Sequence, residues 1–135
     1  MDIEKSLILS AAGMKAQGER LRVIAENLAN SDSTASTPGG DPYRRKVISF
    51  QDVLDRKLGM KVVKADPVRD DPSDFPMKYD PSQPGANKDG YVKMPNVNAL
   101  IELMDMREAQ RSYEANLNMI EVSKSMLSRT LELLR

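Results

Sequence analysis

The positions of the prolines limit the fold of this chain more than any other feature of its sequence. All eight prolines lie between Pro38 and Pro95, so the first 37 and the last 40 residues contain none. A proline inside a helix costs about 3 kcal/mol, so only the two proline-free ends remain available for long helices. Five of the seven glycines and five of the six aromatic residues also lie in the middle. We therefore predict a mainly α fold with two terminal helices and a non-helical insert.

The N-terminal proline-free segment has an apolar repeat of seven residues. A sustained repeat of this length is typical of a coiled-coil seam. Small residues occupy a neighbouring row at the same spacing and would allow a partner helix to approach closely. We predict a helix that starts near Asp2 and ends near Asn30, within an N-terminal helical domain of residues 1–32. The apolar row consists of Leu7, Met14, Leu21 and Leu28.

The C-terminal segment has a wider apolar arc on the same seven-residue spacing. An arc of this width is more than one partner helix needs, which indicates several neighbours. Asn98 follows the last proline and is a candidate N-cap for a C-terminal helical domain of residues 97–135. We predict that the two helices pair as a coiled coil or bundle. Their predicted interface on this side consists of Met106, Tyr113, Leu117, Ile120, Leu127, Leu131 and Leu134.

The insert, residues 33–96, combines strand-like segments with turn residues. Residues 43–50 and 60–65 are rich enough in β-branched and aromatic residues to predict short strands. Residues 87–90 form a predicted tight turn that leads into an extended segment at Tyr91 and Val92. We expect a small irregular or β-rich insert with little core of its own.

Composition excludes several functional classes. The chain has no histidine, cysteine or tryptophan, and its 20 basic residues balance its 20 acidic residues. Ser-His-Asp and Cys-His catalysis, imidazole or thiolate metal sites and disulfides are therefore excluded. We find no catalytic or cofactor-binding pattern and predict that the chain is not an enzyme.

The short charged runs favour ordinary surface roles. The chain lacks the net positive charge expected of a nucleic-acid-binding module, so for the basic run Arg44–Lys46 we predict a charged strand edge or a subunit contact that pairs with acids. The acids Asp66, Asp70, Asp71 and Asp74 lack the spacing of an EF-hand and predict a solvated loop.

The N-terminal apolar segment is a poor match for a signal peptide or a membrane span. Residues 7–14 are apolar, but Asp2 and Glu4 precede them where a signal peptide is positively charged. The segment also continues in phase with Leu21 and Leu28, which favours a retained helix. No run approaches the roughly 20 apolar residues of a transmembrane helix.

Two motifs, one at each end of the insert, resemble those of a known family. The octet Glu-Asn-Leu-Ala-Asn-Ser-Asp-Ser at residues 26–33 resembles the N-terminal signature of bacterial flagellar rod, hook and filament-joining proteins. Residues 89–98, 111–116 and 124–127 resemble the approach to the C-terminal helix of that family and the helix itself. The chain resembles the proximal rod members in its short length and in residues 36–43 and 91–98. Residues 51–78 resemble no family that we recognise.

The resemblance implies a structural subunit of the flagellar basal-body rod within the periplasm. Its implied partners are copies of itself, the other proximal and distal rod proteins, and the flagellar type III export apparatus, with no nucleic acid and no cofactor. The resembling segments contain Asn27, Asn30, Asn96 and Asn116. Of these, Asn27, Asn30 and Asn116 are candidates for polar contacts that fix helix ends and register; the alternative is plain capping or exposure. Ile3 and Leu7 form a possible hydrophobic export signal. A helical adaptor or chaperone is the alternative, followed by a small enzyme.

Overall fold

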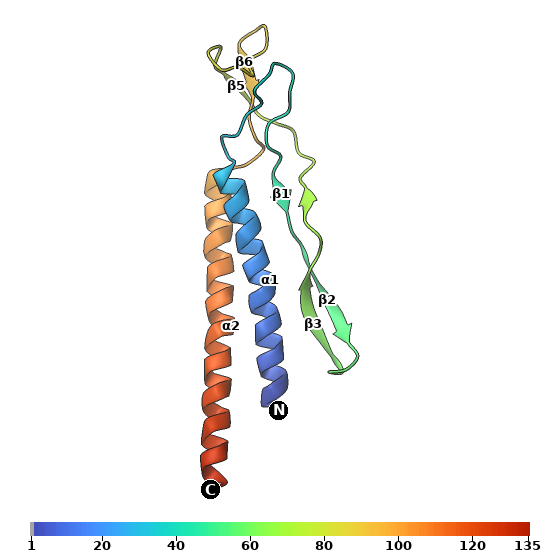
Figure 1. Ribbon diagram of the computed structural model, residues 1–135, viewed down its shortest axis with the longest axis vertical. Coiled ribbons are helices and arrows are strands. Elements are labelled where there is room, and N and C mark those ends of the chain that lie inside the picture. Colours follow the sequence, from blue (N-terminus) through green and yellow to red (C-terminus); the bar gives the residue numbers. More distant parts are fainter. Residues whose placement is uncertain (1) are drawn as a thin grey trace. The chain divides into compact units, whose positions relative to one another are not determined.

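Two long α-helices occupy the proline-free ends of the chain, as the sequence predicts. In the computed structural model, which describes residues 2–135, helix α1 spans Ile3–Ala29 and helix α2 spans Ala99–Leu133 (Figure 1). The β-containing insert lies between them in sequence, which confirms the coarse prediction of two helices and a small insert.

Side chains just before each helix cap its free backbone N–H groups. The Asp2 carboxylate accepts a hydrogen bond from the backbone N–H of Glu4 at 3.0 Å. The Asn98 side-chain oxygen accepts the backbone N–H groups of Leu100 at 3.1 Å and Ile101 at 3.4 Å. The N-cap predicted at Asn98 is therefore confirmed.

The insert forms three antiparallel pairs of strands within the described residues. Strand β1 (Lys46–Val47) pairs with β4 (Arg69–Asp70), β2 (Phe50–Asp55) with β3 (Met60–Ala65), and β5 (Met77–Tyr79) with β6 (Tyr91–Lys93). The strand predicted at 60–65 and the extended segment at Tyr91 are confirmed. The continuous strand predicted at 43–50 is wrong, because the chain changes partner there: β1 pairs with β4 and β2 pairs with β3, and residues 48 and 49 belong to neither strand.

The chain divides into two compact units, and each contains parts of both helices. The first unit comprises residues 1–21, 49–67 and 107–135, and the second comprises residues 22–48 and 68–106.

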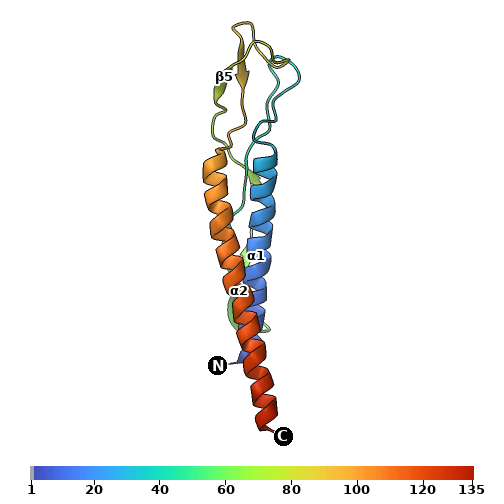
Figure 2. The ribbon, with the colours of Figure 1, turned by 90° about the vertical axis from the view of Figure 1, so that its left-hand side faces the viewer.

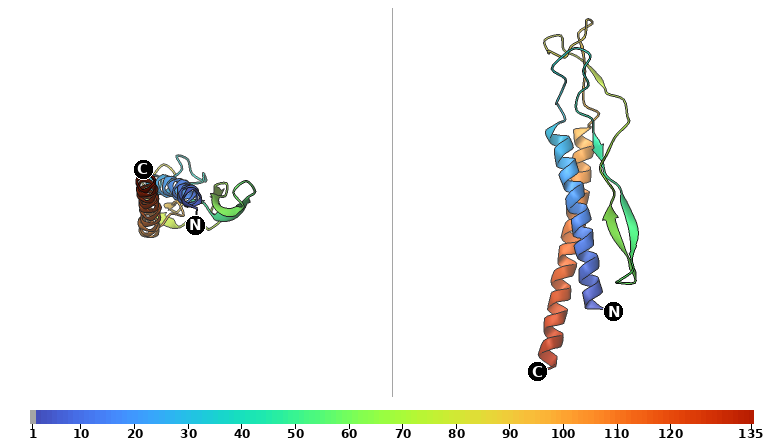
Figure 3. Two further views of the ribbon diagram at one scale, coloured as in Figure 1. Left: turned by 90° about the horizontal axis from the view of Figure 1, so that it is seen from below. Right: turned by 45° about the vertical axis from the view of Figure 1, so that its right-hand side comes forward.

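In the first unit, α1 and α2 run antiparallel. Ser6 Oγ lies 3.3 Å from Ser123 Oγ, and Arg20 forms an ion pair with Glu108 at 3.6 Å. Figure 2 shows the two helices side by side. The left view of Figure 3 shows α1 between α2 and the β2–β3 hairpin. The buried apolar residues of the first unit are small: Ala16, Val62 and Ala109.

The second unit contains the end of α1, the start of α2 and the two smaller strand pairs. Its buried apolar residues are Val23, Ile24 and Val92, and Pro95 is also fully buried. Polar side chains, rather than a large apolar core, connect the elements of this unit.

Candidate functional site

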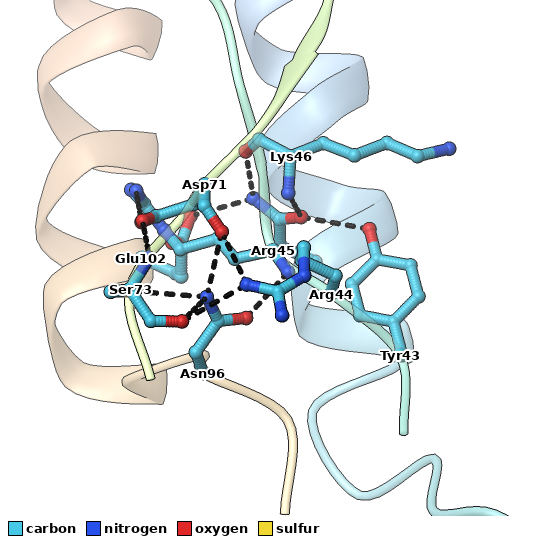
Figure 4. A network of polar contacts seen from close by, with 9 residues as sticks. Tyr43, Arg44, Arg45, Lys46, Asp71, Ser73, Asn96 and Glu102 are labelled. Carbon is cyan, nitrogen blue, oxygen red and sulfur yellow. Dashed lines mark hydrogen bonds and ion pairs between the residues drawn. The ribbon is translucent and has the colours of Figure 1, made fainter. Parts of the chain in front are cut away.

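A network of hydrogen bonds and ion pairs connects the segments of the second unit. It joins the end of α1, strand β1, the loop after β4, the segment before α2 and the first turns of α2. We call it the polar cluster, and Figure 4 shows its members. They are Asn27, Tyr43, Arg44, Arg45, Lys46, Asp71, Ser73, Asn96 and Glu102.

Asn27 binds the backbone of β1 as a neighbouring strand would. Its side-chain nitrogen donates to the Lys46 carbonyl at 2.8 Å, and its side-chain oxygen accepts the Lys46 backbone N–H at 2.9 Å. The same oxygen accepts the Tyr43 hydroxyl at 2.8 Å, and the nitrogen also contacts Glu102 Oε2 at 3.5 Å. Asn27 is 1 % exposed, so its amide is both buried and fully hydrogen-bonded.

Arg45 connects β1 to α2 and to the loop after β4. Its Nε donates to Glu102 Oε1, and its Nη1 forms an ion pair with Asp71 at 3.1 Å. Glu102 is 1 % exposed, and a buried carboxylate without a cation would be strongly destabilising. Arg45 therefore compensates the charge that the first turn of α2 places in the interior.

Asn96 connects the segment before α2 to the loop after β4. Its oxygen accepts the Arg45 backbone N–H at 2.7 Å. Its nitrogen donates to the Asp71 and Ser73 carbonyls, both at 3.2 Å, and to Ser73 Oγ at 3.0 Å. Beside it, the Arg44 guanidinium lies 4.2 Å from the centre of the Phe75 ring.

The surroundings of the cluster shift three pKa values. Hydrogen bonds from Ser73, assisted by Arg45 and opposed by partial burial, lower the pKa of Asp71. Burial alone would lower the pKa of Arg45, but the hydrogen bond and charge of Glu102 outweigh it and raise that pKa. Burial, followed by the charge of Glu26, raises the pKa of Tyr43. The cluster is therefore most stable with Asp71 and Arg45 charged and Tyr43 neutral.

These contacts revise the interpretation of the charged runs. Asp70 and Asp74 are exposed, but Asp70 lies in β4 and not in a loop. Asp66 is half-buried and accepts the Ser49 hydroxyl at 2.9 Å, and Asp71 is an ion-pair partner of Arg45, so the prediction of a solvated loop is wrong for both. The basic run contacts acids of the same chain, since Lys46 also forms an ion pair with Glu26 at 2.5 Å.

Asn30 and Asn116 make local hydrogen bonds. The Asn30 side chain donates to the Glu26 carbonyl at 2.9 Å and accepts the Ser33 hydroxyl at 3.1 Å, at the end of α1. The Asn116 side chain donates to the Ser112 carbonyl at 2.9 Å and lies against Gly13, where an added Cβ would be 2.8 Å from its nitrogen. Gly13 thus allows close approach of the helices in the first unit.

The polar contacts between the helices, and the close approach at Gly13, share one row of α1. On α1 they involve Ser6, Gly13 and Arg20 in the first unit and Asn27 in the second, each seven residues after the last. Each lies one residue, or about 100° of rotation, before the predicted apolar row. That row, Leu7, Met14, Leu21 and Leu28, is half-buried.

On α2 the predicted interface residues become more exposed toward the C-terminus. Met106, Tyr113 and Ile120 are half-buried. The other four are exposed by 39 % to 79 %, namely Leu117, Leu127, Leu131 and Leu134. Ile3 is half-buried at the start of α1.

Sequence reasoning missed the central acid–base pairs of the polar cluster. Glu102 lies one residue before Leu103 in a helix with a broad apolar arc, and nothing local distinguishes it from a solvated glutamate. Arg45 and Asp71 are 26 residues apart in sequence and meet only through the β1–β4 pairing.

Known proteins that are similar to this chain come from one group, the flagellar basal-body rod proteins. Residues 88–133, which contain β6 and all of α2, match the family described as flagellar basal body rod FlgEFG protein C-terminal. Flagellar basal-body rod protein FlgC of Agrobacterium fabrum is 47 % identical over 127 residues, covering 94 % of this chain and 91 % of that protein. FlgC of Bacillus subtilis is 40 % identical over 146 residues, covering 95 % of each chain. FlgC of Salmonella typhimurium is 39 % identical over 127 residues, covering 93 % of this chain and 92 % of that protein.

The chain belongs to the FlgC family of flagellar basal-body rod proteins. The resemblance to flagellar rod proteins found in the sequence is therefore confirmed. The protein is a structural subunit of the basal-body rod and not an enzyme. Neither described helix combines the length and apolarity needed to cross a membrane. Residues 2–135 contain no group of acidic side chains arranged to hold a metal ion.

Proposed function

We propose that the chain polymerises through its terminal helices to form the proximal rod and, as part of this drive shaft, transmits torque. The main supporting observation is where the large apolar side chains lie. The described chain buries alanine, valine and one isoleucine, Ile24, while many of its leucines and methionines are exposed. An apolar patch of this extent is typical of an interaction surface.

The contact row between the helices explains why the leucines remain available. The polar contacts between α1 and α2 share one row of α1, and the longer apolar side chains project beside that row. Full burial of one leucine contributes about 1.5–3 kcal/mol. Leu117, Leu127, Leu131 and Leu134 together would therefore contribute several kcal/mol when neighbouring helices cover them. We propose copies of this chain and the other proximal and distal rod proteins as those neighbours, and a periplasmic location for the assembly.

A charge added at the exposed end of α2 tests this assembly. Leu131→Glu would place a carboxylate in the proposed interface, whereas Asn118→Glu places one about 140° away around the same helix. Both residues are exposed, so neither change should unfold the isolated chain. We expect Leu131→Glu to abolish swimming and rod assembly and Asn118→Glu to preserve both. Normal motility of the Leu131→Glu strain would contradict the proposed interface.

We also propose that the flagellar type III apparatus exports the chain and that Ile3 and Leu7 form its hydrophobic signal. The two residues are four apart on α1 and therefore on one face of the helix. Their replacement by alanine should retain the protein in the cytoplasm, while Leu9→Ala, two residues further along, should not. Secretion of the Ile3→Ala/Leu7→Ala chain at the normal level would contradict the signal.

A further inference from the structure

We propose that the polar cluster makes the pairing of α1 and α2 in the second unit conditional on a folded insert. The two helices can pair there only when segments of the insert have placed a cation beside Glu102. This inference goes beyond the proposed function, because it concerns the folding of a single chain and holds whether or not that chain assembles.

The helices themselves bring no cation to Glu102. Within the second unit they contribute residues 22–29 and 99–106, which we call the helix segments and which contain three acids and a single base. That base is Arg22, whose side chain is 64 % exposed and lies 4.0 Å from an acid of its own helix. The contact that α1 makes with Glu102 is the neutral amide of Asn27, at 3.5 Å. Paired without the insert, the helix segments would therefore bury a carboxylate with no compensating charge.

The place of Glu102 in the first turn of α2 offsets only a small part of this cost. The helix dipole stabilises an acid in the first turn by about two- to fivefold in an equilibrium. A buried carboxylate that lacks its cation shifts the equilibrium the other way, by about two orders of magnitude or more. Glu102 is 1 % exposed, so the larger effect applies. Pairing of the helix segments alone is therefore unfavourable at this point.

The insert supplies the missing cation and fixes its position. Arg45 Nε donates to Glu102 Oε1 (Figure 4). The Arg45 backbone is held by two other segments, because its N–H donates to Asn96 Oδ1 at 2.7 Å and its carbonyl accepts the Asp71 N–H at 2.8 Å. Arg45 therefore reaches Glu102 only when β1, the loop after β4 and the segment before α2 are folded together.

The same strand compensates an acid on each helix. Lys46 follows Arg45 in β1 and forms an ion pair with Glu26 of α1 at 2.5 Å. Both side chains of this second pair are partly exposed, so it is the weaker of the two. Two adjacent residues of β1 thus neutralise one acid of α1 and one of α2, which links the strand to both helices at once.

The first unit shows a different arrangement. There the two helices supply both partners of their polar contacts, Ser6 with Ser123 and Arg20 with Glu108. Helix pairing in that unit therefore does not depend on a charge from the insert. The requirement that we propose is confined to the second unit, where it also disfavours pairing of α2 with any helix that brings no cation.

Loosening the insert alone separates conditional pairing from ordinary stabilisation. Asn96→Ala removes four hydrogen bonds, to Arg45, Asp71 and Ser73, and none of them involves an atom of either helix. Each hydrogen bond lost is worth roughly fivefold in an equilibrium, so amide hydrogen exchange of the insert should rise about tenfold or more. We expect exchange of the helix segments to rise with it by a similar factor.

Removal of the Glu102 charge should abolish this dependence. In Glu102→Met, Arg45 keeps its ion pair with Asp71 at 3.1 Å, so its own charge remains compensated. Asn96→Ala added to Glu102→Met should loosen the insert and leave exchange of the helix segments unchanged. Glu102→Gln retains the shape of the side chain without its charge and should give the same result, so the test does not depend on how well methionine packs.

Asn87→Ala is the matched control in the same insert. Asn87 fixes the β5–β6 turn by accepting the backbone N–H groups of Asp89 at 3.0 Å and Tyr91 at 2.9 Å. Its replacement should raise exchange of residues 87–91 and leave the helix segments unchanged, with or without the Glu102 charge. Hydrogen exchange of the full chain, followed by mass spectrometry of its peptides, measures all of these variants.

Three results would overturn the proposal. The first is continued protection of the helix segments in Asn96→Ala while the insert exchanges faster. The second is a rise in the helix segments that has the same size with and without the Glu102 charge. The third is an equal rise in residues 8–17 of the first unit, because that would show general destabilisation of the chain.

Discussion

Replacement of Asn27 by alanine should destabilise the chain far more than an ordinary change at a helix end. The side chain of Asn27 satisfies the N–H and carbonyl of Lys46 and the hydroxyl of Tyr43 at 2.8–2.9 Å. Each such hydrogen bond contributes about 1 kcal/mol net, and a buried group left without a partner costs about 1–3 kcal/mol. We therefore expect Asn27→Ala to lower the free energy of unfolding by about 3 kcal/mol.

Asn30 provides the matched control, three residues along the same helix. Its side chain makes one bond to the Glu26 carbonyl and one to the exposed Ser33, so Asn30→Ala should cost about 1 kcal/mol or less. Urea unfolding followed by far-ultraviolet circular dichroism measures both changes. The slope with urea should stay constant, because the surface exposed on unfolding does not change.

A double-mutant cycle with Tyr43→Phe makes the test specific. Phenylalanine retains the ring and removes only the hydroxyl that donates to Asn27. If that bond contributes as argued, the two substitutions should couple by about 0.5–1.5 kcal/mol. Equal destabilisation by Asn27→Ala and Asn30→Ala, or additivity in the cycle, would refute the role assigned to the Asn27 amide.

Three further predictions use the same unfolding assay. Arg45→Met should lower the free energy of unfolding by about 3–5 kcal/mol, because it leaves the Glu102 charge buried without a partner. Arg45→Met combined with Glu102→Met should restore most of that free energy. No recovery in the double variant would contradict this role of Arg45. Gly90→Ala should lower the free energy of unfolding by about 2 kcal/mol and Gly59→Ala by about 1 kcal/mol. Both glycines have a positive φ, but only Gly90 also lies against the Tyr79 ring. Equal losses in the two variants would contradict a role for the ring contact. The raised pKa of Tyr43 contributes stability that is complete below the usual value of about 10 and is lost as pH rises through the folded value. The free energy of unfolding should therefore fall less between pH 9 and 11 for Tyr43→Phe than for the unsubstituted chain, and parallel pH curves would contradict the assignment.

The helix ends were predictable because their signals are local. The absence of proline at either end, together with caps at Asp2 and Asn98, is sufficient to place α1 and α2 to within a few residues. Strand β3 was predictable for the same reason, since a run rich in valine is bounded by turn residues.

The polar cluster was not predictable because its partners are brought together only by the fold. Asn27 and Glu102 are 75 residues apart, and Arg45 reaches Glu102 across 57 residues. A single sequence gives no sign of which charged residue among 40 becomes buried. The motif around Asn27 indicated importance, but its chemical role as a partner of the β1 backbone required the structure.

The helix contact row shows a limit of periodicity. A seven-residue repeat identifies the face of a helix, but several rows of α1 share that period. The leucine row is the most apparent, yet the polar contacts to α2 in the two units follow the small and polar row beside it. Hydrophobicity alone therefore did not identify the row that makes these polar contacts.

The Asn27 amide also protects the free edge of strand β1. A short strand with an open backbone edge is a template on which an extended segment of another chain can add, which leads to aggregation. In β1 one edge pairs with β4, and at Lys46 the opposite N–H and carbonyl are both bound by Asn27. A foreign strand could pair there only by displacing this amide from a buried site. In the rod assembly that we propose, this edge of β1 would therefore take no part in strand pairing between neighbouring subunits.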